Sequence, residues 1–378
     1  MTFQEEQPQA PHPARRAIAS ARSLVIKLGT AVLTGGTDQI DRGYLHDLAA
    51  HLTAARDEGR RVLVVSSGAI GAGIGVLGLP SRPDDVATLQ AAAAAGQPRL
   101  MSIWRDALDA RRTPAAQILI SRSDLDSRER YLNIRNCAGA LQRLGAIPIV
   151  NENDTVATEE ISLGDNDVLA AKLAVAVQAE ALVILTTGPG VLDGADQLVH
   201  EAPDAASLRT LVRPIKTSQG RGGMATKVEA VRLATQAGIA AAIAPGRPHH
   251  ALAALLRGER VGTAVAGADA RLRGRRLWIA LSATPSGVLT VDEGAARALV
   301  ERNASLLARG VVSVSGAFEP GDVVSIRDSS GRELARGLSN FSAEHARRVM
   351  GRPSSEFESV LGFRTHEELV HRDNLALS

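Results

Sequence analysis

Short apolar runs alternate with longer segments of helical periodicity over the first two thirds of the chain. Runs this short and this uniformly apolar are typical of strands that are buried on both faces of a sheet. One of the periodic segments between them ends at Gly59, a residue type that stops helices. The predicted strands are residues 23–30, 61–70 with a break at 66–68, 115–120, 146–150, 181–187, 239–244 and an edge strand at 263–267; the predicted helices are residues 41–58, 88–110, 131–144, 168–177 and a helix that follows a glycine-rich loop within 219–238.

A strand, a helix and a further strand in succession form a β-α-β unit, in which the two strands are parallel. Repeated along the chain, this unit predicts an α/β fold, with an open, mostly parallel sheet between two helical layers. Ligands of such sheets bind in the loops at the carboxyl ends of the strands. Candidate chemistry is therefore expected in the loops that follow the predicted strands.

The pattern changes in the last third of the chain, after a charged joint at residues 269–276. Short strands separated by turn signals follow, and residues 328–331 read as a hairpin turn. This part predicts a small, mainly β domain with strands at 287–291, 311–316, 322–326 and 333–338 and helices at 292–302 and 342–350. The predicted organisation is a disordered tail at 1–22, an α/β domain at 23–267, a linker at 268–275 and the β domain with a C-terminal extension at 276–378.

Composition adds few constraints to this plan. Hydrophobic residues make up 45% of the 378 residues but aromatic residues only 2%, so Ala, Val, Leu and Ile must fill the cores. Lys and Arg number 43 against 41 Asp and Glu, a balance that does not attract nucleic acid or membrane. The single cysteine, Cys137, excludes an intramolecular disulfide, and no apolar run is long enough to span a bilayer. We expect a cytoplasmic protein.

Two clusters of amides and carboxylates flank one connection in the middle of the chain. Asn151 to Asp154 follow a buried strand, and Asp165 to Asp167 precede an apolar helix. A lone Asn-Asp turn is usually only a solvated turn. Two such clusters, the first at the carboxyl end of a strand, suit a substrate with an ammonium group, or a site that must hold lysines or a metal ion.

Other strand ends carry complementary groups. Lys27 lies near the end of the first strand, Ser67 and Gly68 follow the second, and Lys227 lies on a helix that opens from a glycine-rich loop. Backbone N–H groups at such a helix start bind anions. Two lysines, acidic groups and an anion-binding loop are the parts required for phosphoryl transfer, although no P-loop motif occurs. A G-x-G-x-x-G match at 73–78 falls inside a helix, where its glycines favour close helix packing rather than nucleotide binding.

These segments carry a family resemblance. Residues 25–36, 66–70, 151–157, 164–167 and 222–227 resemble the amino acid kinase family, and within it the bacterial branch that phosphorylates glutamate. Residues 290–299, 305–310 and 316–324 resemble the PUA domain that many members of this branch carry. The resemblance extends over about residues 23 to 375. It implies the amino acid kinase fold, a three-layer αβα arrangement, followed by a PUA domain.

The resemblance also implies an activity: ATP and Mg²⁺ would be used to phosphorylate the γ-carboxylate of L-glutamate, the first step of proline synthesis. It further implies feedback inhibition by proline, a homo-oligomer, and hand-over of the acyl phosphate to glutamate-5-semialdehyde dehydrogenase. No protein ligand for the metal is expected. By motif match, the catalytic residues would be Lys27, Asp167 and Lys227; the glutamate-binding residues Ser67, Asp154 and Asn166; and the ATP-binding residues Lys27, Thr186, Thr187, Gly222, Gly223, Met224, Ala225, Thr226 and Lys227.

Two positions depart from the family pattern, and two alternative functions stay open. Thr187 stands where the family has aspartate, and Arg221 where it has threonine, both beside the expected ATP site. A PUA protein that binds RNA, with a degenerate kinase domain, is one alternative, because a basic patch lies at Arg271, Arg273, Arg275 and Arg276. A solvated linker explains that patch better, since acidic residues occur throughout the β domain. The other alternative is a kinase of the same fold that acts on another carboxylate.

Overall fold

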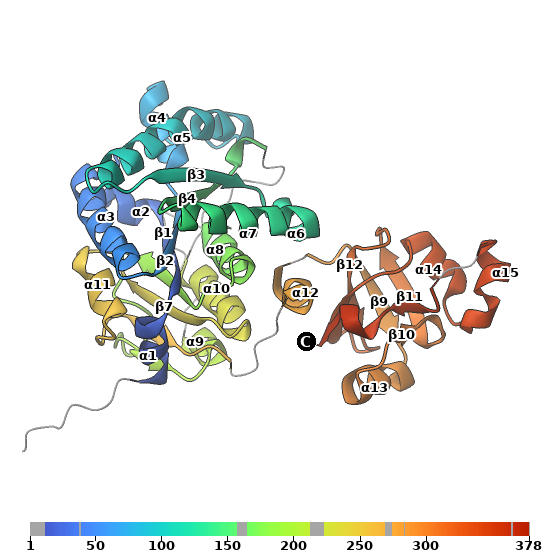
Figure 1. Ribbon diagram of the computed structural model, residues 1–378. Coiled ribbons are helices and arrows are strands. Elements are labelled where there is room, and N and C mark those ends of the chain that lie inside the picture. The colour runs from blue at the N-terminus through green and yellow to red at the C-terminus, as the bar shows by residue number, and fades with distance from the viewer. Residues whose placement is uncertain are drawn as a thin grey trace, which may run out of the picture. The chain divides into compact units, whose positions relative to one another are not determined.

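The computed structural model describes residues 12–37, 39–156, 165–211, 223–268, 274–282, 284–363 and 366–377. The chain divides into two compact units (Figure 1). The first comprises Met1–Leu125 and Glu129–Arg271, and the second comprises Asp126–Arg128 and Leu272–Ser378.

The first unit is built on a sheet that has eight strands among the described residues. All neighbouring pairs from β3 to β7 are parallel, β8 is antiparallel to β7, and β6 is parallel to β8. The predicted open, mostly parallel sheet is therefore confirmed. In spatial order the strands are β3 (Ala115–Ile120), β4 (Ile147–Glu152), β2 (Arg61–Ser66), β1 (Ser23–Leu28), β5 (Ala181–Thr186), β7 (Ala240–Pro245), β8 (Thr263–Val265) and β6 (Glu201–Ala202).

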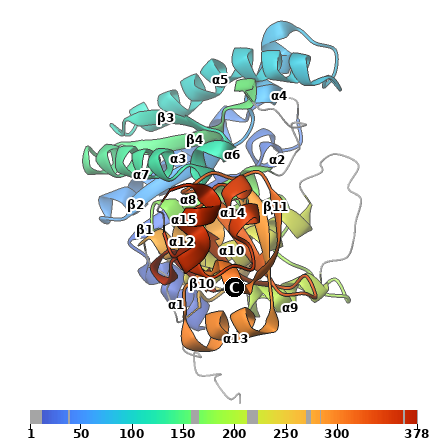
Figure 2. The ribbon, with the colours of Figure 1, turned by 90° about the vertical axis from the view of Figure 1, so that its right-hand side faces the viewer.

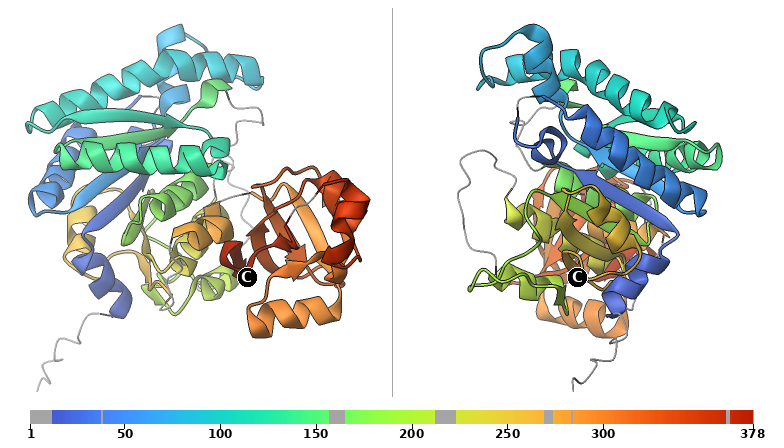
Figure 3. Two further views of the ribbon diagram at one scale, coloured as in Figure 1. Left: turned by 45° about the vertical axis from the view of Figure 1, so that its right-hand side comes forward. Right: turned by 90° about the vertical axis from the view of Figure 1, so that its left-hand side faces the viewer.

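Helices cover both faces of this sheet, as predicted (Figure 3). On β1, Leu24, Ile26 and Leu28 face one helical layer and join its apolar core. Because side chains alternate along a strand, Lys27 faces the other layer. The first layer contains α1 (Pro13–Ser20), α3 (Arg42–Asp57), α5 (Val86–Asp109) and α11 (His250–Leu256), and the second contains α7 (Arg128–Arg143), α8 (Asp165–Ala176) and α10 (Met224–Gln236).

One prediction at the far side of the sheet is wrong in detail. Residues 263–267 were expected to form the edge strand, but β6 lies outside β8. Helix α9 (Ala205–Leu211) follows β6 in the chain. A two-residue strand such as β6 has no periodicity of its own, so its place depends on pairing with β8.

The disordered tail expected at residues 1–22 is wrong for residues 13–20, which form α1. Pro13 occupies the first turn, where its missing N–H costs no hydrogen bond, and Ile18 is fully buried. Arg15 is also buried and forms an ion pair with Glu201 at 2.5 Å, while its guanidinium donates to the backbone oxygens of Glu259 and Val261. These distant partners hold the helix against the edge of the sheet.

Helix α4 (Ala69–Leu77) packs against α5 through glycines (Figure 2). A Cβ atom on Gly73 would lie 1.7 Å from the carbonyl oxygen of Ala92, and one on Gly96 would lie 1.9 Å from that of Ala69. At Gly75, by contrast, a Cβ atom would meet no atom within 4 Å. The G-x-G-x-x-G match therefore serves helix packing at Gly73.

The second unit is small and mainly β, as predicted. Its five-stranded sheet has the order β11-β9-β12-β13-β15, and β10 pairs with β14 in a second sheet. Asp328 begins the predicted hairpin turn, in which its side chain accepts a hydrogen bond from the Ser330 N–H. The elements are α12 (Gly274–Leu277), β9 (Gly287–Val291), α13 (Glu293–Arg302), β10 (Leu306–Leu307), β11 (Val311–Gly316), β12 (Val323–Arg327), β13 (Glu333–Leu338), α14 (Ala343–Val349), α15 (Phe357–Leu361), β14 (Glu368–Val370) and β15 (Leu375–Leu377).

Two short helices complete the first part of the chain, α2 (Thr30–Thr34) and α6 (Arg122–Asp126). Among the described residues, no helix combines the length and the apolar character that a membrane crossing requires.

Candidate active site

Several candidate residues meet at the carboxyl edge of the sheet in the first unit. Lys27 is the penultimate residue of β1, and Ser67 directly follows β2. Asn151 lies near the end of β4. The amino ends of α8 and α10, which cover the face onto which Lys27 projects, bring Asp167 and Lys227 to the same place.

The core of the site is a carboxylate shared by two lysines. Asp167 Oδ1 lies 2.6 Å from Lys27 Nζ, and Asp167 Oδ2 lies 3.0 Å from Lys227 Nζ. The exposed fractions of Lys27, Asp167 and Lys227 are 4%, 0% and 9%. With one carboxylate between two ammonium groups, the buried cluster carries a net positive charge when all three groups are ionised, which favours an anionic ligand.

The pKa values in the cluster follow from burial and from mutual charge. Burial alone would raise the pKa of Asp167, but the two ammonium groups outweigh it and hold this pKa below its usual range. Burial lowers the pKa of Lys27, assisted by the charge of Lys227 and opposed by that of Asp167. The geometry thus keeps Asp167 ionised and leaves the lysine charges only partly compensated.

A pH dependence follows from the lowered pKa of Asp167. The unfolded chain takes up this proton more readily than the folded one, so the stabilisation is complete above the ordinary carboxyl pKa of about 4 and declines as the pH falls below it. Asp167→Asn mimics the protonated form and leaves two buried ammonium groups without a counter-ion. We expect it to reduce the free energy of unfolding by about 3 kcal/mol near pH 7. Urea denaturation at several pH values should show this difference shrinking below about pH 4, and a difference independent of pH would contradict the assignment.

Helix α10 begins as an anion-binding helix would. Its N-cap, Gly223, contributes no side-chain cap, so the first N–H groups of the helix have no side-chain acceptor from that residue. The Thr226 hydroxyl lies 2.9 Å from both Asp167 Oδ2 and the Gly223 carbonyl oxygen. Met224 and Ala225 occupy the first turn between them. Gly222 and Arg221 lie outside the described residues.

On the neighbouring strand, Thr186 is the last residue of β5 and is buried, whereas Thr187 is exposed. The Thr186 carbonyl oxygen accepts a hydrogen bond from the N–H of Gly246, in the loop after β7. The two threonines therefore lie at the same edge of the sheet as Lys27, and Thr187 is the one whose side chain faces outward.

A polar chain leads from the edge into the interior. Asn166 Nδ2 lies 2.9 Å from Ser67 Oγ and 3.1 Å from Asn151 Oδ1. Asn151 Nδ2 donates in turn to Gln97 Oε1 at 2.9 Å, and Gln97 Nε2 donates to Gln117 Oε1 at 3.0 Å. Asn166 Oδ1 is buried and has no hydrogen-bond partner among the described residues. An acceptor in this state suits a ligand that donates, such as an ammonium group.

The candidate residue Asp154 opens a short 3₁₀ turn, Asp154–Val156, which is separated from the end of β4 by one residue. Burial lowers the pKa of Arg82, and the charge of Asp154 acts on this pKa in the opposite direction. Arg82 is therefore a neighbour of Asp154 that sequence analysis did not single out. A lone arginine in a loop gives no sequence signal for such a contact.

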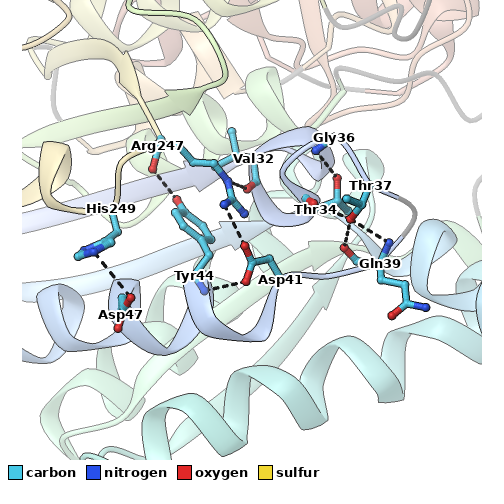
Figure 4. Close-up of polar contacts among 11 residues, drawn as sticks. Val32, Thr34, Gly36, Thr37, Gln39, Asp41, Tyr44, Asp47, Arg247 and His249 are labelled. Atoms are coloured by element: carbon cyan, nitrogen blue, oxygen red, sulfur yellow. Dashed lines mark hydrogen bonds and ion pairs between the residues drawn. The ribbon is translucent and has the colours of Figure 1, made fainter.

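A further set of contacts, also unpredicted, holds the segment that follows Lys27 (Figure 4). Arg247 Nε donates to the Val32 carbonyl oxygen at 3.0 Å, and its Nη1 lies 2.9 Å from Asp41 Oδ2. The Tyr44 hydroxyl donates to the Gly246 carbonyl oxygen at 2.9 Å. These contacts join α2 and α3 to the loop after β7, and so brace the turn between Lys27 and α2.

The described residues contain no group of three or more His, Cys, Asp or Glu side chains that could hold a metal ion. Mg²⁺ in phosphoryl-transfer sites is usually bound by one or two carboxylates together with substrate phosphates and water.

Residues 22–245 match the model of the amino acid kinase family, and residues 287–361 match that of the PUA domain. The first match extends over the whole parallel core of the sheet and includes Lys27, Asp167 and Lys227. The chain belongs to the amino acid kinase family.

Within that family, the chain belongs with the glutamate 5-kinases. It is 41% identical over 371 residues to the glutamate 5-kinase of Methylococcus capsulatus, covering 96% of this chain and 99% of that protein. The glutamate 5-kinases of Moorella thermoacetica and Pseudomonas entomophila are each 42% identical, over 368 and 370 residues; each match covers 96% of this chain, with 97% and 100% of the respective relative. A solved structure of Giardia carbamate kinase covers 66% of this chain and 100% of its own, with a TM-score of 0.49 and 15% identity.

Proposed function

We propose that the chain transfers the γ-phosphoryl group of ATP to the γ-carboxylate of L-glutamate, giving γ-L-glutamyl phosphate and ADP. The observation that carries this proposal is the pair of buried lysines, Lys27 and Lys227, held by the two oxygens of Asp167 beside the amide cluster at Asn166. Positive charges that could bind a phosphoryl group therefore lie next to polar groups that could bind an amino acid, at one edge of the sheet.

The reaction forms a bond between a γ-carboxylate oxygen and the γ-phosphorus and breaks the bond from that phosphorus to the β,γ-bridging oxygen, whose electron pair leaves with ADP. The carboxylate is already a nucleophile at neutral pH, so no side chain has to remove a proton. The obstacle is repulsion between two anions, which Lys27 and Lys227 offset while Asp167 keeps them in place. Mg²⁺, when bound with ATP, would supply further neutralisation of the phosphates.

The roles of the other candidate residues are inferred from where they lie at this edge of the sheet. Gly223, Met224, Ala225 and Thr226 form the helix start that would receive ATP phosphates, together with Gly222 by motif. Thr186 and Thr187 would lie beside the nucleotide. Ser67, Asn166 and Asp154 would bind glutamate. Its ammonium group would face Asp154 and Asn166 Oδ1, an oxygen without a hydrogen-bond partner among the described residues.

An acceptor screen tests the proposal. ADP release should be measured with glutamate, N-acetylglutamate, aspartate, carbamate and UMP, with hydroxylamine present to trap an acyl phosphate as the hydroxamate. Glutamate alone should support rapid ADP release with equal hydroxamate formation. Faster turnover of another acceptor would assign the site to a different carboxylate, and no turnover with any acceptor would point to a non-catalytic role.

Asp154→Asn is expected to raise the KM for glutamate by about tenfold or more, because a charge-assisted hydrogen bond to the ammonium group is lost. The KM for ATP should stay within about twofold, since the nucleotide contacts lie on other loops. Asp109→Asn, a charge change at an exposed position near the end of α5, is the matched control. Equal losses for both substrates, or an unchanged glutamate KM, would remove Asp154 from the acceptor site.

Proline is expected to inhibit by competing with glutamate. It carries the same α-carboxylate and a cationic α-nitrogen, but it has no γ-carboxylate to phosphorylate. Initial rates over a grid of both concentrations should extrapolate to one maximal velocity. A maximal velocity that falls with proline at constant glutamate KM would require a separate inhibitory site.

The chain is proposed to act in the cytoplasm and to form a homo-oligomer. Acyl phosphates hydrolyse readily in water, which favours direct transfer of the product to the enzyme that reduces it, glutamate-5-semialdehyde dehydrogenase.

A further inference from the structure

A second polar pocket lies at the opposite, amino edge of the sheet. It has a volume of about 290 Å³ and is lined by three arginines, Arg61, Arg135 and Arg143, with Asn136, Gln142 and Gln178. Arg61 is the first residue of β2, whereas Ser67, at the catalytic edge, directly follows the last residue of that strand. A strand of this length separates the two sites by about 17 Å. The pocket is therefore distinct from the site described above.

The three guanidinium groups have no carboxylate partner among the residues that the structure describes. Nearby arginines behave differently: Arg56 forms an ion pair with Asp57 at 2.6 Å, and Arg60 one with Glu58 at 3.4 Å. The pocket lining contains no Asp or Glu. The pocket therefore brings together three positively charged guanidinium groups that no carboxylate among the described residues neutralises.

Uncharged residues of the pocket lie beside the three arginines. Arg143 Nη1 lies 3.4 Å from the position that a Cβ atom on Gly139 would occupy, which is an ordinary contact distance, so the Arg143 side chain lies beside Gly139. Gln142 is anchored by a hydrogen bond from its Nε2 to the Val62 carbonyl oxygen at 3.2 Å. The amides of Asn136 and Gln178 add neutral hydrogen-bonding groups around the charges.

We propose that this arginine pocket, defined by Arg61, Arg135, Arg143, Asn136, Gln142 and Gln178, binds the phosphate group of a small molecule. A doubly charged tetrahedral oxyanion accepts hydrogen bonds from several guanidinium groups at once and neutralises their mutual repulsion. The volume is at the lower end of small-ligand pockets, which fits inorganic phosphate or a compact phosphate ester rather than a polymer.

Isothermal titration calorimetry with inorganic phosphate tests this proposal. The full-length chain should first be saturated with a non-hydrolysable ATP analogue and Mg²⁺, so that the catalytic phosphate positions are filled. Ionic strength is held constant with potassium chloride. We expect one phosphate bound per chain, and an affinity at least about tenfold weaker for Arg135→Gln combined with Arg143→Gln.

The matched control is Arg297→Gln combined with Arg309→Gln, which makes the same change of net charge at exposed positions of the second unit. It should bind phosphate as the unaltered chain does. Circular dichroism of both double variants checks folding, and Arg61→Gln provides an independent test from another element. Glycerol 3-phosphate in place of inorganic phosphate distinguishes an ester ligand from the free ion.

Three results would overturn the proposal. These are no phosphate binding to the analogue-saturated chain, equal weakening in the pocket and control variants, and binding of a tricarboxylate such as citrate as tight as that of both phosphate compounds. The second result would indicate a general effect of net charge, and the third a pocket without preference for phosphate.

Discussion

Lys227→Met is expected to lower kcat by about 100- to 1,000-fold while the KM for glutamate changes by less than about threefold. Lys227 Nζ is fixed 3.0 Å from Asp167 Oδ2 at the start of α10, and the residue is only 9% exposed. Because the site is buried, the charge of Lys227 is only weakly screened, and it acts most strongly on the phosphoryl group as that group moves between two oxygens. Steady-state rates with both substrates varied separate the two parameters.

Lys227→Arg provides the matched comparison. It keeps the positive charge, but the planar guanidinium is larger than an ammonium group and cannot occupy the same position. Its kcat should therefore fall between those of the unaltered chain and Lys227→Met. Near-normal kcat in Lys227→Met, with the fold intact by circular dichroism, would exclude Lys227 from the chemical step.

Gly73→Ala is expected to be the most destabilising of the glycine-to-alanine changes in α4. The new Cβ atom would lie 1.7 Å from the Ala92 carbonyl oxygen, which is backbone and cannot rotate away. Helices α4 and α5 would have to separate, with a loss of about 3 kcal/mol or more of unfolding free energy. Because α4 begins two residues after Ser67, the folded fraction should also show a higher KM for glutamate.

Gly75→Ala makes the same chemical change on the same helix in open space. There we expect stability to rise by up to about 1 kcal/mol, since alanine is the better helix former. Urea denaturation of the two variants side by side provides the measurement. Similar stability in both would show that the α4–α5 contact is not as close as the structure has it.

The sheet could be predicted because its strands are apolar over most of their length. The predicted bounds of β3 agree with the structure at both ends, and the predicted break at Ser66–Gly68 coincides with the end of β2. Helix α1 could not be predicted in this way. Its buried Arg15 looks like a surface residue in sequence, and its burial is made favourable by distant partners: Glu201, the His200 carbonyl oxygen and the backbone near residue 260.

For the site, motif position led to Lys27, Asp167 and Lys227, and the structure brings the three together. Their burial and the division of the Asp167 oxygens between the lysines depend on the packing of α8 and α10, which local sequence does not specify. The contacts of Gln97 and Gln117 could not be predicted from the sequence for the same reason. Gln97 lies in an alanine-rich helix segment, and nothing nearby in sequence indicates that its amide reaches Asn151.

The central place of β1 has a consequence for synthesis on the ribosome. β1 pairs with β2, which follows it closely in the chain, and with β5, which begins at residue 181. A nascent chain that has emerged only as far as β4 can assemble the strands from β3 to β1, but one edge of β1 then lacks its neighbour. Such an edge pairs readily with other chains, so this wholly buried strand would be an aggregation hazard until β5 arrives. Asp167 emerges just ahead of β5, so the counter-ion of Lys27 becomes available at about the same stage of translation as the strand that covers the edge.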